Sequence, residues 1–379
     1  MSEWQVTKLG SLGKVVTGKT PSKDNPEDWG SEVLFITPSD YKYYGKYANS
    51  SIRMLSSIGA KRQDNRLLPK SSILVTCIGS DMGKTAINSE ACVTNQQINA
   101  IIPNKTANPD FIYYLTKELY ETLSSLGSDG TAVPILNKSD FENIDIAIPN
   151  LEEQKAIASV LSSLDDKIDL LHRQNTTLER MAETLFRQWF IEEAQEDWEL
   201  RKLGDCVTIS YGKNLPTKNL LDDGYPVFGA NGQIGFYNHY TYEESQVLVS
   251  CRGEASGKVN ISLPKSYVTN NSLALERNKR PEISFEFLKY WALFYDFNLH
   301  VSGSAQPQIT IDGLYGADFT IPPKEFIGNF SLITRSLETK KLNNFYQIQT
   351  LEKLRDTLLP KLMSGEVRVT LNGEHHDAI

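Results

Sequence analysis

Cysteine and histidine are scarce in this chain of 379 residues, and neither is arranged for metal binding. The four cysteines (Cys77, Cys92, Cys206 and Cys251) form no C-x-x-C pair, and no histidine stands at ligand spacing from them. A zinc site and a disulfide framework are therefore not expected, and four small buried side chains are the simpler interpretation. We predict no metal site in this chain.

The sequence signatures of common active sites are also absent. The chain has no Gly-x-Gly-x-x-Gly, no Gly-x-Ser-x-Gly, no His-Glu-x-x-His and no [Asn/Asp]-Pro-Pro-aromatic loop for methylation of exocyclic amines. Asp165 and Asp166 are adjacent on a predicted helix, where their side chains diverge by about 100° and do not form an acid–base pair. We predict no catalytic residue and no enzymatic activity.

Long apolar runs are missing as well. No stretch approaches the roughly 18 apolar residues of a membrane helix, and the start MSEWQVTKLG has neither the basic nor the apolar region of a signal peptide. The expected location is the cytoplasm. With 40% hydrophobic and 23% charged residues, the composition is that of a globular protein with room for two or more domains.

The chain contains an internal duplication. The stretch CIGSDMGK at 77–84 resembles the phosphate-binding loop of an ATPase, but Gly79 and Gly83 are one residue too close together for that loop. The same pattern returns 174 residues later as CRGEASGK at 251–258, with both glycines in place. We interpret the two stretches as repeated turns, in which glycine permits tight geometry or close approach of the backbone.

Other blocks repeat in the same order, as in a duplicated domain. Each half begins with a tryptophan, Trp4 or Trp198, followed by a Leu-Gly and then a Gly-Lys pair. The remaining pairs are ILVTCIG at 73–79 with VLVSCRG at 247–253, TNQ at 94–96 with TNN at 269–271, GTAVP at 130–134 with GSAQP at 303–307, and IAIP at 146–149 with FTIP at 319–322.

Within each half, strands are predicted first and a helix afterwards. Short β-branched runs punctuated by Gly, Pro, Asn and Ser predict strands, for example at 33–37, 73–78 and 98–102. A helix follows at 109–126 in the first half and at 283–299 in the second. Their aromatic residues are interpreted as core side chains rather than platforms for stacking bases, because amphipathic helices bury such residues. These residues are Tyr113, Tyr114, Trp291 and Tyr295.

Each half closes with a long predicted helix. The first begins after Asn150, the expected N-cap, and runs without Gly or Pro to Phe190, and the second spans about 324–363. Apolar residues recur at steps of three and four, the pattern of a coiled-coil seam. The seam residues are Leu161, Leu164, Ile168, Leu171, Leu178 and Leu185 in the first helix and Leu337, Leu351 and Leu358 in the second.

The second seam is poorer than the first. Lys341 and Asn344 stand where the first helix has Ile168 and Leu171, Asn175 interrupts the first seam, and a proline is expected to disturb the end of the second helix. Pairing the helices would bury both stripes, so a coiled coil between them is predicted. About 39 residues at ~1.5 Å each give a rod of roughly 58 Å, enough to separate two domains by a DNA turn of ~34 Å.

The distribution of charge bears on the partner. The net charge is −8, which alone argues against nucleic acid, but most of the acidity lies in 151–197, with eleven acidic and five basic residues. By contrast, 41–72 holds seven Lys and Arg residues and one Asp among four tyrosines. A local basic, aromatic surface is what phosphate contacts require. A solvated loop explains the same stretch equally well.

These features together resemble the specificity subunits of type I DNA restriction-modification systems. The resemblance rests on W-x-x-x-x-L-G, G-K-T-P-S-K, F-I-T-P-S-D, I-L-V-T-C-I-G-x-x-x-G-K, T-N-Q-Q-I and I-P-x-x-x-E-Q before a long helix, in this order and repeated with divergence. It covers nearly the whole chain. It implies an α/β (α+β) fold in which two similar target-recognition domains are separated by two long helices that form an antiparallel coiled coil around a pseudo-two-fold axis.

The resemblance also divides the chain into segments. The expected segments are the first target-recognition domain at 1–150, the first long helix and linker at 151–197, the second target-recognition domain at 198–323, the second long helix at 324–366 and a polar C-terminal tail at 367–379.

By the same resemblance, the function is to read a split DNA sequence, with one half-site for each domain and a spacer set by the helices. The second half carries YPVFGANGQIGFYN at 225–238, which has no counterpart in the first, so an asymmetric site is expected. No cofactor is expected in this chain. S-adenosylmethionine, ATP and Mg would serve partner subunits, namely two methyltransferase subunits and motor-nuclease subunits. Helix residues that would dock the methyltransferase, or form an ordinary solvated face, are Arg173, Gln174, Arg180 and Arg187.

Residues expected to contact DNA lie in the repeated loops and in the basic stretch. Lysine and arginine should mainly contact phosphate, whereas amides pair bidentately with adenine and guanidinium groups with guanine. The predicted phosphate contacts are Lys19, Lys23, Lys42, Lys46, Arg53, Lys61, Arg62, Arg66, Lys84, Lys213, Lys218 and Lys258, and Ser80 is a further expected DNA contact. The predicted base readers are Gln96, Gln97, Asn231, Gln233, Arg252, Asn270 and Asn271.

Two other classes of function stay open on the sequence alone. A fused methyltransferase or nuclease would need a hidden active-site motif, and binding of S-adenosylmethionine by the isolated chain would reveal it. A coiled-coil adaptor without DNA specificity would use the duplicated domains to bind proteins, and its complex would lack the steep salt dependence that phosphate contacts produce.

Overall fold

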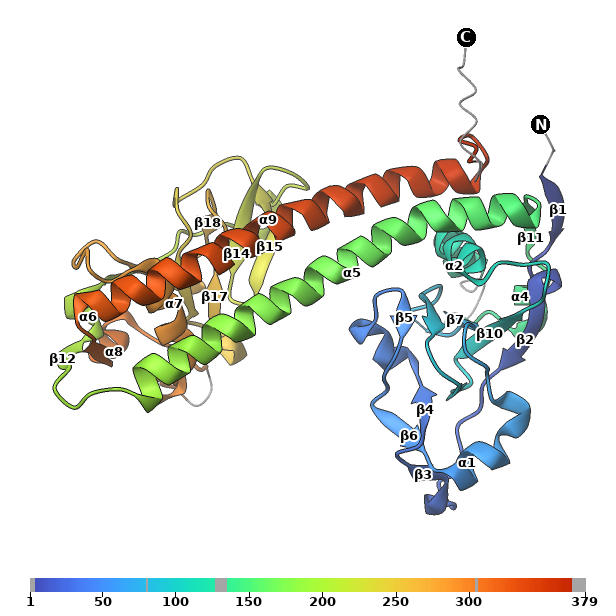
Figure 1. The fold of residues 1–379 in the computed structure, drawn as a ribbon, viewed down its shortest axis with the longest axis horizontal. Coiled ribbons are helices and arrows are strands. Elements are labelled where there is room, and N and C mark those ends of the chain that lie inside the picture. The colour runs from blue at the N-terminus through green and yellow to red at the C-terminus, as the bar shows by residue number, and fades with distance from the viewer. Residues whose placement is uncertain (1–3, 80, 127–134, 304–305, 370–379) are drawn as a thin grey trace, which may run out of the picture. The chain divides into compact units, whose positions relative to one another are not determined.

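The computed structural model describes residues 4–79, 81–126, 135–303 and 306–369, and Figure 1 shows their helices and strands. The chain divides into two compact units, one drawn from Met1–His172 and Phe345–Ile379 and the other from Arg173–Asn344. Each unit joins a mixed β domain to a segment of both long helices, so the unit boundaries fall inside the helices instead of at their ends. In the part of the chain that the structure describes, no helix is apolar enough over a sufficient length to span a membrane.

The first unit contains two main sheets and a short β ribbon. The five-stranded sheet has the order β2 (Gly13–Thr17), β10 (Ile98–Pro103), β7 (Ile73–Thr76), β8 (Thr85–Asn88) and β5 (Tyr47–Ala48). The four-stranded sheet has the order β3 (Trp29–Gly30), β6 (Arg53–Leu55), β4 (Val33–Ile36) and β9 (Cys92–Thr94), and β1 (Gln5–Lys8) pairs with β11 (Asp145–Ile148). The predicted strands at 33–37, 73–78 and 98–102 are confirmed as β4, β7 and β10.

Short helices cover these sheets. They are α1 (Ser57–Arg62), α2 (Pro109–Glu118), α3 (Tyr120–Leu126) and α4 (Lys138–Glu142), with 3-10 turns η1 (Leu9–Leu12), η2 (Pro26–Asp28), η3 (Pro38–Tyr43) and η4 (Asp64–Arg66). Asn108 caps α2 by accepting a hydrogen bond from the Phe111 backbone at 2.9 Å, and Pro109 occupies the first turn. The helix predicted at 109–126 is therefore present, but it breaks at Leu119 into α2 and α3.

The second unit repeats this plan. A four-stranded sheet has the order β13 (Thr208–Tyr211), β19 (Ser272–Glu276), β16 (Val247–Ser250) and β17 (Val259–Ile261), a three-stranded sheet has the order β15 (Gly232–Tyr237), β14 (Tyr225–Gly229) and β18 (Tyr267–Val268), and β12 (Glu199–Lys202) pairs with β20 (Asp318–Ile321). The helices are α6 (Leu203–Cys206), α7 (Phe285–Phe294) and α8 (Ile311–Tyr315), with 3-10 turns η6 (Thr217–Asn219), η7 (Gly253–Ala255) and η8 (Phe297–His300).

The duplication predicted from the sequence is visible in the sheets. The antiparallel order β2-β10-β7-β8 of the first unit matches β13-β19-β16-β17 of the second. The two units differ in their second sheet. The second unit carries the β14–β15 hairpin, whose sequence at 225–238 has no counterpart in the first half. The repeated blocks at 130–134 and 303–307 lie largely outside the described residues.

Both long helices form at the predicted places. Helix α5 (Leu151–Arg187) begins with Asn150, whose side chain accepts a hydrogen bond from the Glu153 backbone at 3.0 Å, and it ends in a π turn, η5 (Gln188–Glu192). Helix α9 spans Lys324–Met363. The sequence predicts that Pro360 disturbs the end of this helix. That prediction is wrong, because the helix continues past Pro360 to Met363. A proline so close to the end removes only one hydrogen bond of the last turn.

Within each unit, the segments of α5 and α9 run antiparallel. In the first unit, Ile168 and Leu171 of α5 pack against Ile348 and Leu351 of α9. In the second unit, Asn344 of α9 donates a hydrogen bond to the Asn175 side chain of α5 at 2.8 Å. The two asparagines that interrupt the predicted seams therefore bond to each other.

The predicted seam residues are buried to different degrees. Leu161, Ile168 and Leu171 are buried, and the remaining seam residues are half-buried. The ends of the helices also contribute to the domain cores, since Leu161 lies in the core of the first unit with Leu359, and Phe330 lies in the core of the second. The seam thus serves two purposes, because its middle joins the helices and its ends join them to the domains.

A tyrosine holds each domain to its helix segment. The Tyr114 hydroxyl of α2 donates to Asp165 of α5 at 2.6 Å, and Figure 1 shows α2 beside this part of α5. In the second unit, Tyr290 of α7 donates to Glu338 of α9 at 2.5 Å. Glu338 stands 173 residues after Asp165, the offset that also relates the repeated prolines 149 and 322. The interaction is therefore part of the duplication.

The aromatic residues of α2 and α7 belong to the cores, as predicted. Tyr113 and Tyr114 are buried in the core of the first unit, and Trp291 and Tyr295 pack against that of the second. Trp291 and Tyr295 also stack on each other, with ring centroids 4.7 Å apart. These rings are not exposed platforms for bases.

The asparagine pair in the second unit gives a test of the helix pairing. We expect Asn344→Leu to lower the free energy of unfolding by about 1–3 kcal/mol, because Asn175 then loses its buried donor. The double variant with Asn175→Leu should recover most of this loss, since leucine fits an apolar seam. Thermal and urea unfolding of both variants measures the effect.

Asn343→Leu is the matched control, because Asn343 is the exposed neighbour on the same helix. It should change stability by no more than about 0.5 kcal/mol. A single Asn344→Leu variant as stable as the parent would show that the pair does not hold the helices in register.

Candidate nucleic-acid interface

In the first unit, three loops far apart in sequence meet at one edge of the five-stranded sheet. The pairing of Thr17 with Asn99, Ile98 with Thr76, and Val75 with Thr85 places the end of β2, the start of β10, the end of β7 and the start of β8 side by side. The residues beyond these strand ends are the Gly-Lys loop at 18–23, the TNQQ turn at 94–97 and the CIGSDMGK turn at 77–84. We call this set the first loop edge.

Backbone hydrogen bonds tie the first loop edge together. The Lys19 N–H donates to the Thr94 carbonyl at 2.9 Å, and the Cys77 N–H donates to the Gln97 carbonyl at 2.7 Å. The CIGSDMGK turn closes on itself, because the Gly83 N–H donates to the Thr76 carbonyl at 2.8 Å. The conformation of the edge therefore depends mainly on the backbone. Among its side chains, Met82 and Thr94 are buried, whereas Lys19 and Gln96 are exposed.

The second unit builds the same edge. The Lys213 N–H donates to the Val268 carbonyl at 2.9 Å, the Cys251 N–H to the Asn271 carbonyl at 2.9 Å, and the Gly257 N–H to the Ser250 carbonyl at 2.9 Å. Each bond has its counterpart in the first unit. We call the loops at 212–218, 251–258 and 268–271 the second loop edge.

The four glycines of the repeated turns have the role that the sequence indicated. Gly79 and Gly83 have φ of 90° and 89°, and Gly253 and Gly257 have φ of 72° and 91°. Only glycine adopts such angles without strain. A Cβ atom at Gly79 or Gly253 would meet no atom within 4 Å, so the demand there is for backbone conformation and not for space.

The glycine of each Gly-Lys loop has a different role. A Cβ atom on Gly18 would lie 2.2 Å from the Thr94 carbonyl oxygen, and one on Gly212 would lie 2.2 Å from that of Thr269. No side chain fits in this space, so both glycines let the loop pass close to the neighbouring turn. Lys19 and Lys213, which follow them, are exposed.

The polar side chains at the two edges differ. Gln96 is exposed at the first edge and accepts a hydrogen bond from Thr20 at 2.8 Å, while Gln97 is half-buried and accepts one from Asn95 at 2.8 Å. At the second edge Asn271 is exposed and Asn270 is half-buried. The structure therefore brings the predicted amide readers to the loop edges, with one amide better exposed than its neighbour in each.

The β14–β15 hairpin adds two further predicted readers to the second edge. Asn231 stands in its turn and Gln233 on β15, and both are exposed. The Asn260 side chain of β17 donates to the Ala230 carbonyl at 3.0 Å, which fixes the tip of the hairpin against the sheet. Asn231 and Lys258 line one shallow hollow with the turn at 254–257.

Lys46 does not belong to an exposed basic surface, contrary to the prediction. Its side chain is buried, and its ammonium group contacts Asp110 at 2.7 Å and the Ser162 hydroxyl of α5 at 2.7 Å. The ring of Tyr114 lies 5.1 Å from the same ammonium group. Lys46 thus anchors its loop to α2 and α5, because a buried lysine needs a carboxylate and hydrogen-bond partners.

The other predicted basic residues of the first unit are exposed or half-buried, but several have partners. Arg62 contacts Glu27 at 2.9 Å and Asp28 at 2.7 Å, and Lys84 contacts Asp81 at 2.8 Å. The hydrogen bonds to Glu27 and Asp28 raise the pKa of Arg62. Arg66 bonds to Asn65 at 3.1 Å, and Ser80 lies outside the described residues. Lys19, Lys23, Lys42 and Lys61 are exposed without an ion pair among the described residues.

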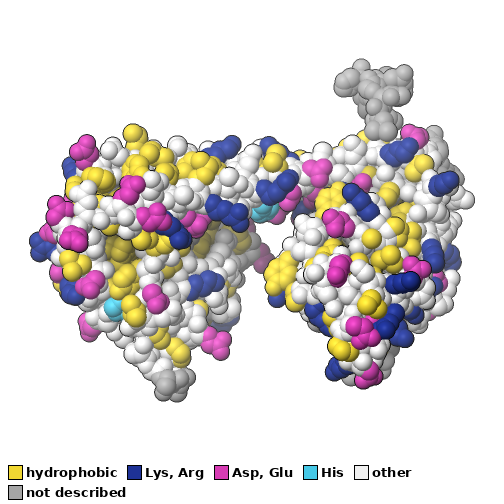
Figure 2. Space-filling view, turned by 60° about the horizontal axis from the view of Figure 1, so that its bottom comes forward, with side chains coloured by type: hydrophobic (Ala, Val, Ile, Leu, Met, Phe, Trp, Pro, Cys, Tyr) yellow, Lys and Arg dark blue, Asp and Glu magenta, His cyan; other side chains and the backbone are white. Residues whose placement is uncertain are grey.

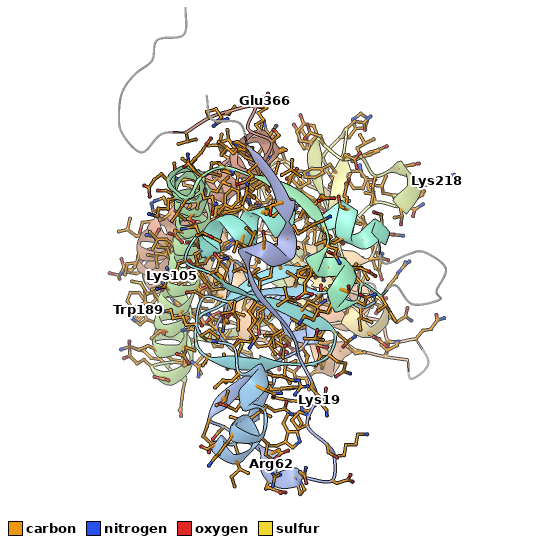
Figure 3. All side chains as sticks on the ribbon, turned by 90° about the vertical axis from the view of Figure 1, so that its right-hand side faces the viewer. Lys19, Arg62, Lys105, Trp189, Lys218 and Glu366 are labelled. Atoms are coloured by element: carbon orange, nitrogen blue, oxygen red, sulfur yellow. The ribbon has the colours of Figure 1, made fainter. Side chains whose placement is uncertain are left out.

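Figures 2 and 3 locate these groups on the first unit. In the space-filling view, Lys and Arg side chains gather over its lower part, with Asp and Glu between them. The side view places Lys19 and Arg62 together at this end. Lys19 of the Gly-Lys loop and Arg62 of the basic stretch therefore lie toward the same end of the unit in this view. Lys218 lies on the exposed loop after β13 in the second unit.

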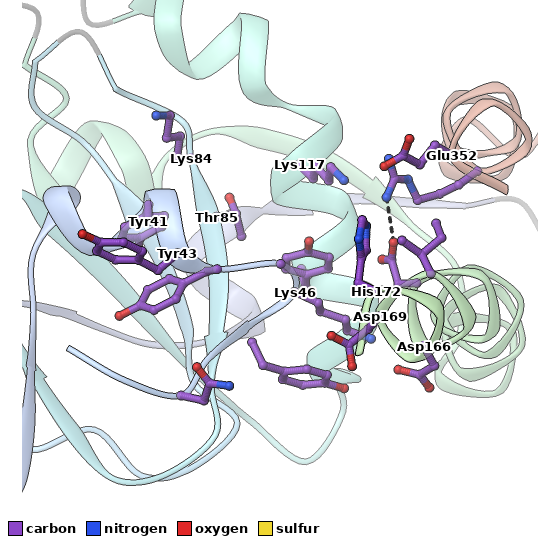
Figure 4. A pocket seen from close by; sticks show the side chains of 18 of the residues that line it. Tyr41, Tyr43, Lys46, Lys84, Thr85, Lys117, Asp166, Asp169, His172 and Glu352 are labelled. Carbon is purple, nitrogen blue, oxygen red and sulfur yellow. Dashed lines mark hydrogen bonds and ion pairs between the residues drawn. The ribbon is translucent and has the colours of Figure 1, made fainter. Parts of the chain in front are cut away.

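A cavity of about 690 Å³ lies between the β domain of the first unit and its helix segments. Figure 4 shows Lys46 and Lys117 on the domain side and Asp166, Asp169 and His172 on α5. Burial and the nearby Arg355 lower the pKa of Lys117. Arg355 itself contacts Asp165 at 2.8 Å. These charges join the domain to the helices, so the cavity is a seam between two packed parts and not an exposed basic groove.

The cysteines and the groups that could bind a metal are described for the same residues as the fold. There, Cys77, Cys92, Cys206 and Cys251 are free and buried, as predicted, and burial raises the pKa of each thiol. Within the same residues, no group of three His, Cys, Asp or Glu side chains could hold a metal ion.

One aromatic residue of the site was missed from the sequence. The Arg53 guanidinium lies over the Trp29 ring, 3.5 Å from its centroid. The two residues are 24 positions apart, and only the pairing of β3 with β6 brings them together. A lone tryptophan between two short strands carries no signal of this contact.

The positive φ angles give a test of the repeated turn. We expect Gly253→Ala to lower the free energy of unfolding by about 1–2 kcal/mol, because alanine is strained at this φ although no atom blocks its methyl group. Gly316→Ala is the control in the same unit. Gly316 has a φ of −76° and equally open surroundings, so its replacement should be neutral or stabilising by up to about 1 kcal/mol.

Chemical denaturation compares the two variants with the parent. Equal effects of both substitutions would show that the turn is not held in the left-handed conformation.

Comparison with known proteins agrees with this geometry. The family model described as "Type I restriction modification DNA specificity domain" matches residues 1–180 and 195–353. The specificity subunit of the type I restriction enzyme MjaIX of Methanocaldococcus jannaschii is 30% identical over 97% of this chain and 94% of its own length. That of HindI from Haemophilus influenzae is 34% identical over 44% of this chain and 37% of its own length.

A solved structure has a similar fold. The S subunit of a type I restriction-modification system from M. genitalium superposes with a TM-score of 0.63 at 21% identity, covering 95% of this chain and 96% of that one. The likeness therefore extends over both units. On the match of the family model to both halves and the full-length relative, the chain belongs to the type I restriction-modification DNA specificity family, whose members are non-catalytic subunits.

Proposed function

We propose that this chain reads an asymmetric, bipartite DNA sequence, with one half-site for each unit. The observation that carries the proposal is the pair of loop edges. The two edges have the same pattern of backbone hydrogen bonds, but their exposed side chains differ. A shared frame presents the loops in the same way in each unit. Different side chains on that frame would select different bases, since base edges are distinguished by hydrogen-bond pattern.

The exposed polar groups support the assignment of roles. Amide side chains such as Gln96 and Asn271 can pair bidentately with adenine, and Arg252 with guanine. Exposed lysines around them, including Lys19 and Lys213, would contact phosphate and hold the loops at the groove. Lys46 is excluded from this set because it is buried.

The long helices would set the spacer between the half-sites. Helices α5 and α9 have 37 and 40 residues, and each runs without interruption from one unit into the other. At ~1.5 Å per residue they are roughly 55–60 Å long, more than one DNA turn of ~34 Å. A continuous helix is stiffer than a loop of the same length, which suits a fixed spacing.

The helices would also dock partner subunits. Leu332 and Ile333 of α9 and Met181 of α5 are exposed in the second unit, at 78%, 41% and 49%, and Leu170 and Leu354 are exposed in the first. Exposed apolar side chains along a helix suit a protein partner better than solvent. We assign this role to two methyltransferase subunits, with motor-nuclease subunits completing the complex. S-adenosylmethionine, ATP and Mg²⁺ would act in those partners.

Exchange of one recognition domain tests independent reading. Replacing residues 198–323 with those of another family member should change one half-site and leave the other half-site and the spacer as they were, because both helices are retained. Mapping N6-methyladenine in the host, with the gene deleted and then restored in each form, gives both half-sites and the spacer together.

The same map separates the alternatives. A change in both half-sites would contradict independent reading. An unchanged methylation pattern on deletion, together with complex formation that is insensitive to salt, would favour the adaptor without DNA specificity.

Leu332 tests the docking face. We expect Leu332→Ser to reduce co-purification of the methyltransferase subunit by about tenfold or more, in the range of an interface hot spot, without lowering the melting temperature of the isolated chain. Leu299→Ser is the matched control, since Leu299 is 75% exposed but lies in η8 of the recognition domain. Equal retention of the partner by both variants would remove α9 from the interface.

A further inference from the structure

We infer that Arg53 reads a guanine in the half-site of the first unit and that Trp29 positions it for this task. The inference rests on the proposed DNA reading and adds a specific contact to it. It also changes the role first expected for Arg53, which was a phosphate contact like that of its basic neighbours.

The Arg53 side chain is held by stacking. Its guanidinium carbon lies 3.5 Å from the centroid of the Trp29 ring and 5.6 Å from that of Phe35. Trp29 is itself fixed, because its ring meets Phe35 edge to face at 5.1 Å and 87°. A planar guanidinium stacks well on such a ring, which fixes its plane and lowers the entropy lost when it makes a further bond.

Among the residues that the structure describes, none accepts a hydrogen bond from the Arg53 guanidinium. Its side chain is exposed, and it forms no ion pair or side-chain hydrogen bond within the described residues. Arg62 makes a useful contrast, since its guanidinium is already occupied by Glu27 and Asp28. Stacking covers a face of the Arg53 group and leaves its N–H edge available. Arg53 is thus a preoriented cation with several free donors.

The strand register places Arg53 near the first loop edge. It stands opposite Phe35 in the pairing of β6 with β4, and the next residue of β4, Ile36, stands opposite Thr94 of β9. The Ile36 carbonyl accepts a hydrogen bond from Asn95 at 3.1 Å. Arg53 is therefore two strands from the turn that carries Gln96, or about 10 Å at the usual strand spacing.

Guanine is the base that this geometry fits. Its O6 and N7 atoms accept two parallel hydrogen bonds from a guanidinium fork in the major groove, and no other base edge offers that pair. A phosphate could also accept from arginine, but it does not require a fixed plane, and an ammonium group serves it too. The rigid stacking of Arg53 therefore favours a base edge.

The test compares Arg53→Lys with the parent in the assembled complex. Binding is measured on duplexes in which each position of the first half-site is varied in turn. We expect the parent to prefer guanine at one position by about 5- to 150-fold. Arg53→Lys should lose this preference at that position alone, because lysine keeps the charge and lacks the fork.

Two control variants lie in the same domain, one at an expected phosphate contact and one at a neighbouring arginine. Lys61→Ala should weaken binding to all duplexes alike and lower the salt slope by about one, and Arg62→Lys should leave the guanine preference intact. A uniform loss for Arg53→Lys, or a first half-site with no guanine, would overturn the inference while the proposed function stands. A parent complex with no sequence preference would instead refute the proposed function.

Trp29→Leu tests the positioning role. It should reduce the same guanine preference without affecting the second half-site, because the guanidinium then loses its support. Trp29→Phe, which keeps an aromatic face, should retain most of the preference. A Trp29→Leu variant that is stably folded and keeps the full preference would show that the stacking does not position Arg53.

Discussion

A half-buried carboxylate on a long helix is the constraint on which each unit depends. Asp165 accepts a hydrogen bond from Tyr114 of the first domain and contacts Arg355 of α9, and Glu338 accepts from Tyr290 and contacts Lys289 in the second. Burial and the adjacent carboxylate raise the pKa of both tyrosines well above the usual value, so their hydroxyls stay protonated as donors. One carboxylate therefore ties a recognition domain to a helix and pairs with a cation. Each cation also contacts a second carboxylate, which is Asp356 for Arg355 and Glu179 for Lys289.

The two units solve the charge balance differently around this shared bond. The first uses an arginine across the helix pair and the buried Lys46 on its own domain loop. The second uses Lys289 of α7 and Lys341 of α9, which both contact Glu179 of α5 as well as Glu338. Burial lowers the pKa of Lys289, and the Glu338 carboxylate opposes that shift. From the sequence, Lys341 interrupts the apolar seam of α9. Its partner Glu179 lies on α5, so the sequence of α9 alone does not reveal the ion pair.

The sequence predicts this fold well where the signal is local or repeated. The long helices, the duplication, the buried aromatics of α2 and the glycine turns all follow from spacing, since helical periodicity and positive φ leave a mark on nearby residues. Contacts between distant segments leave no such mark. The basic stretch could not show that Lys46 turns inward to Asp110 and Ser162 while Lys42 stays exposed, and nothing near Trp29 indicates that Arg53 stacks on it. The packing of a loop on helices decides the role of Lys46, and the pairing of two strands decides that of Arg53.

The loop edges show how one fold can carry two surfaces with different side chains, as the proposed reading of two half-sites requires. Their backbone hydrogen bonds and their glycines at positive φ are the same in both units. Asp81 and Met82 in the first turn can therefore be replaced by Ala255 and Ser256 in the second while the bond closing each turn is kept at 2.8–2.9 Å. The tyrosine and the carboxylate that fasten each domain are not residues of its loop edge. Because the fastening and the variable edge use different residues, a change in the bases read need not disturb the attachment of the domain to the helices.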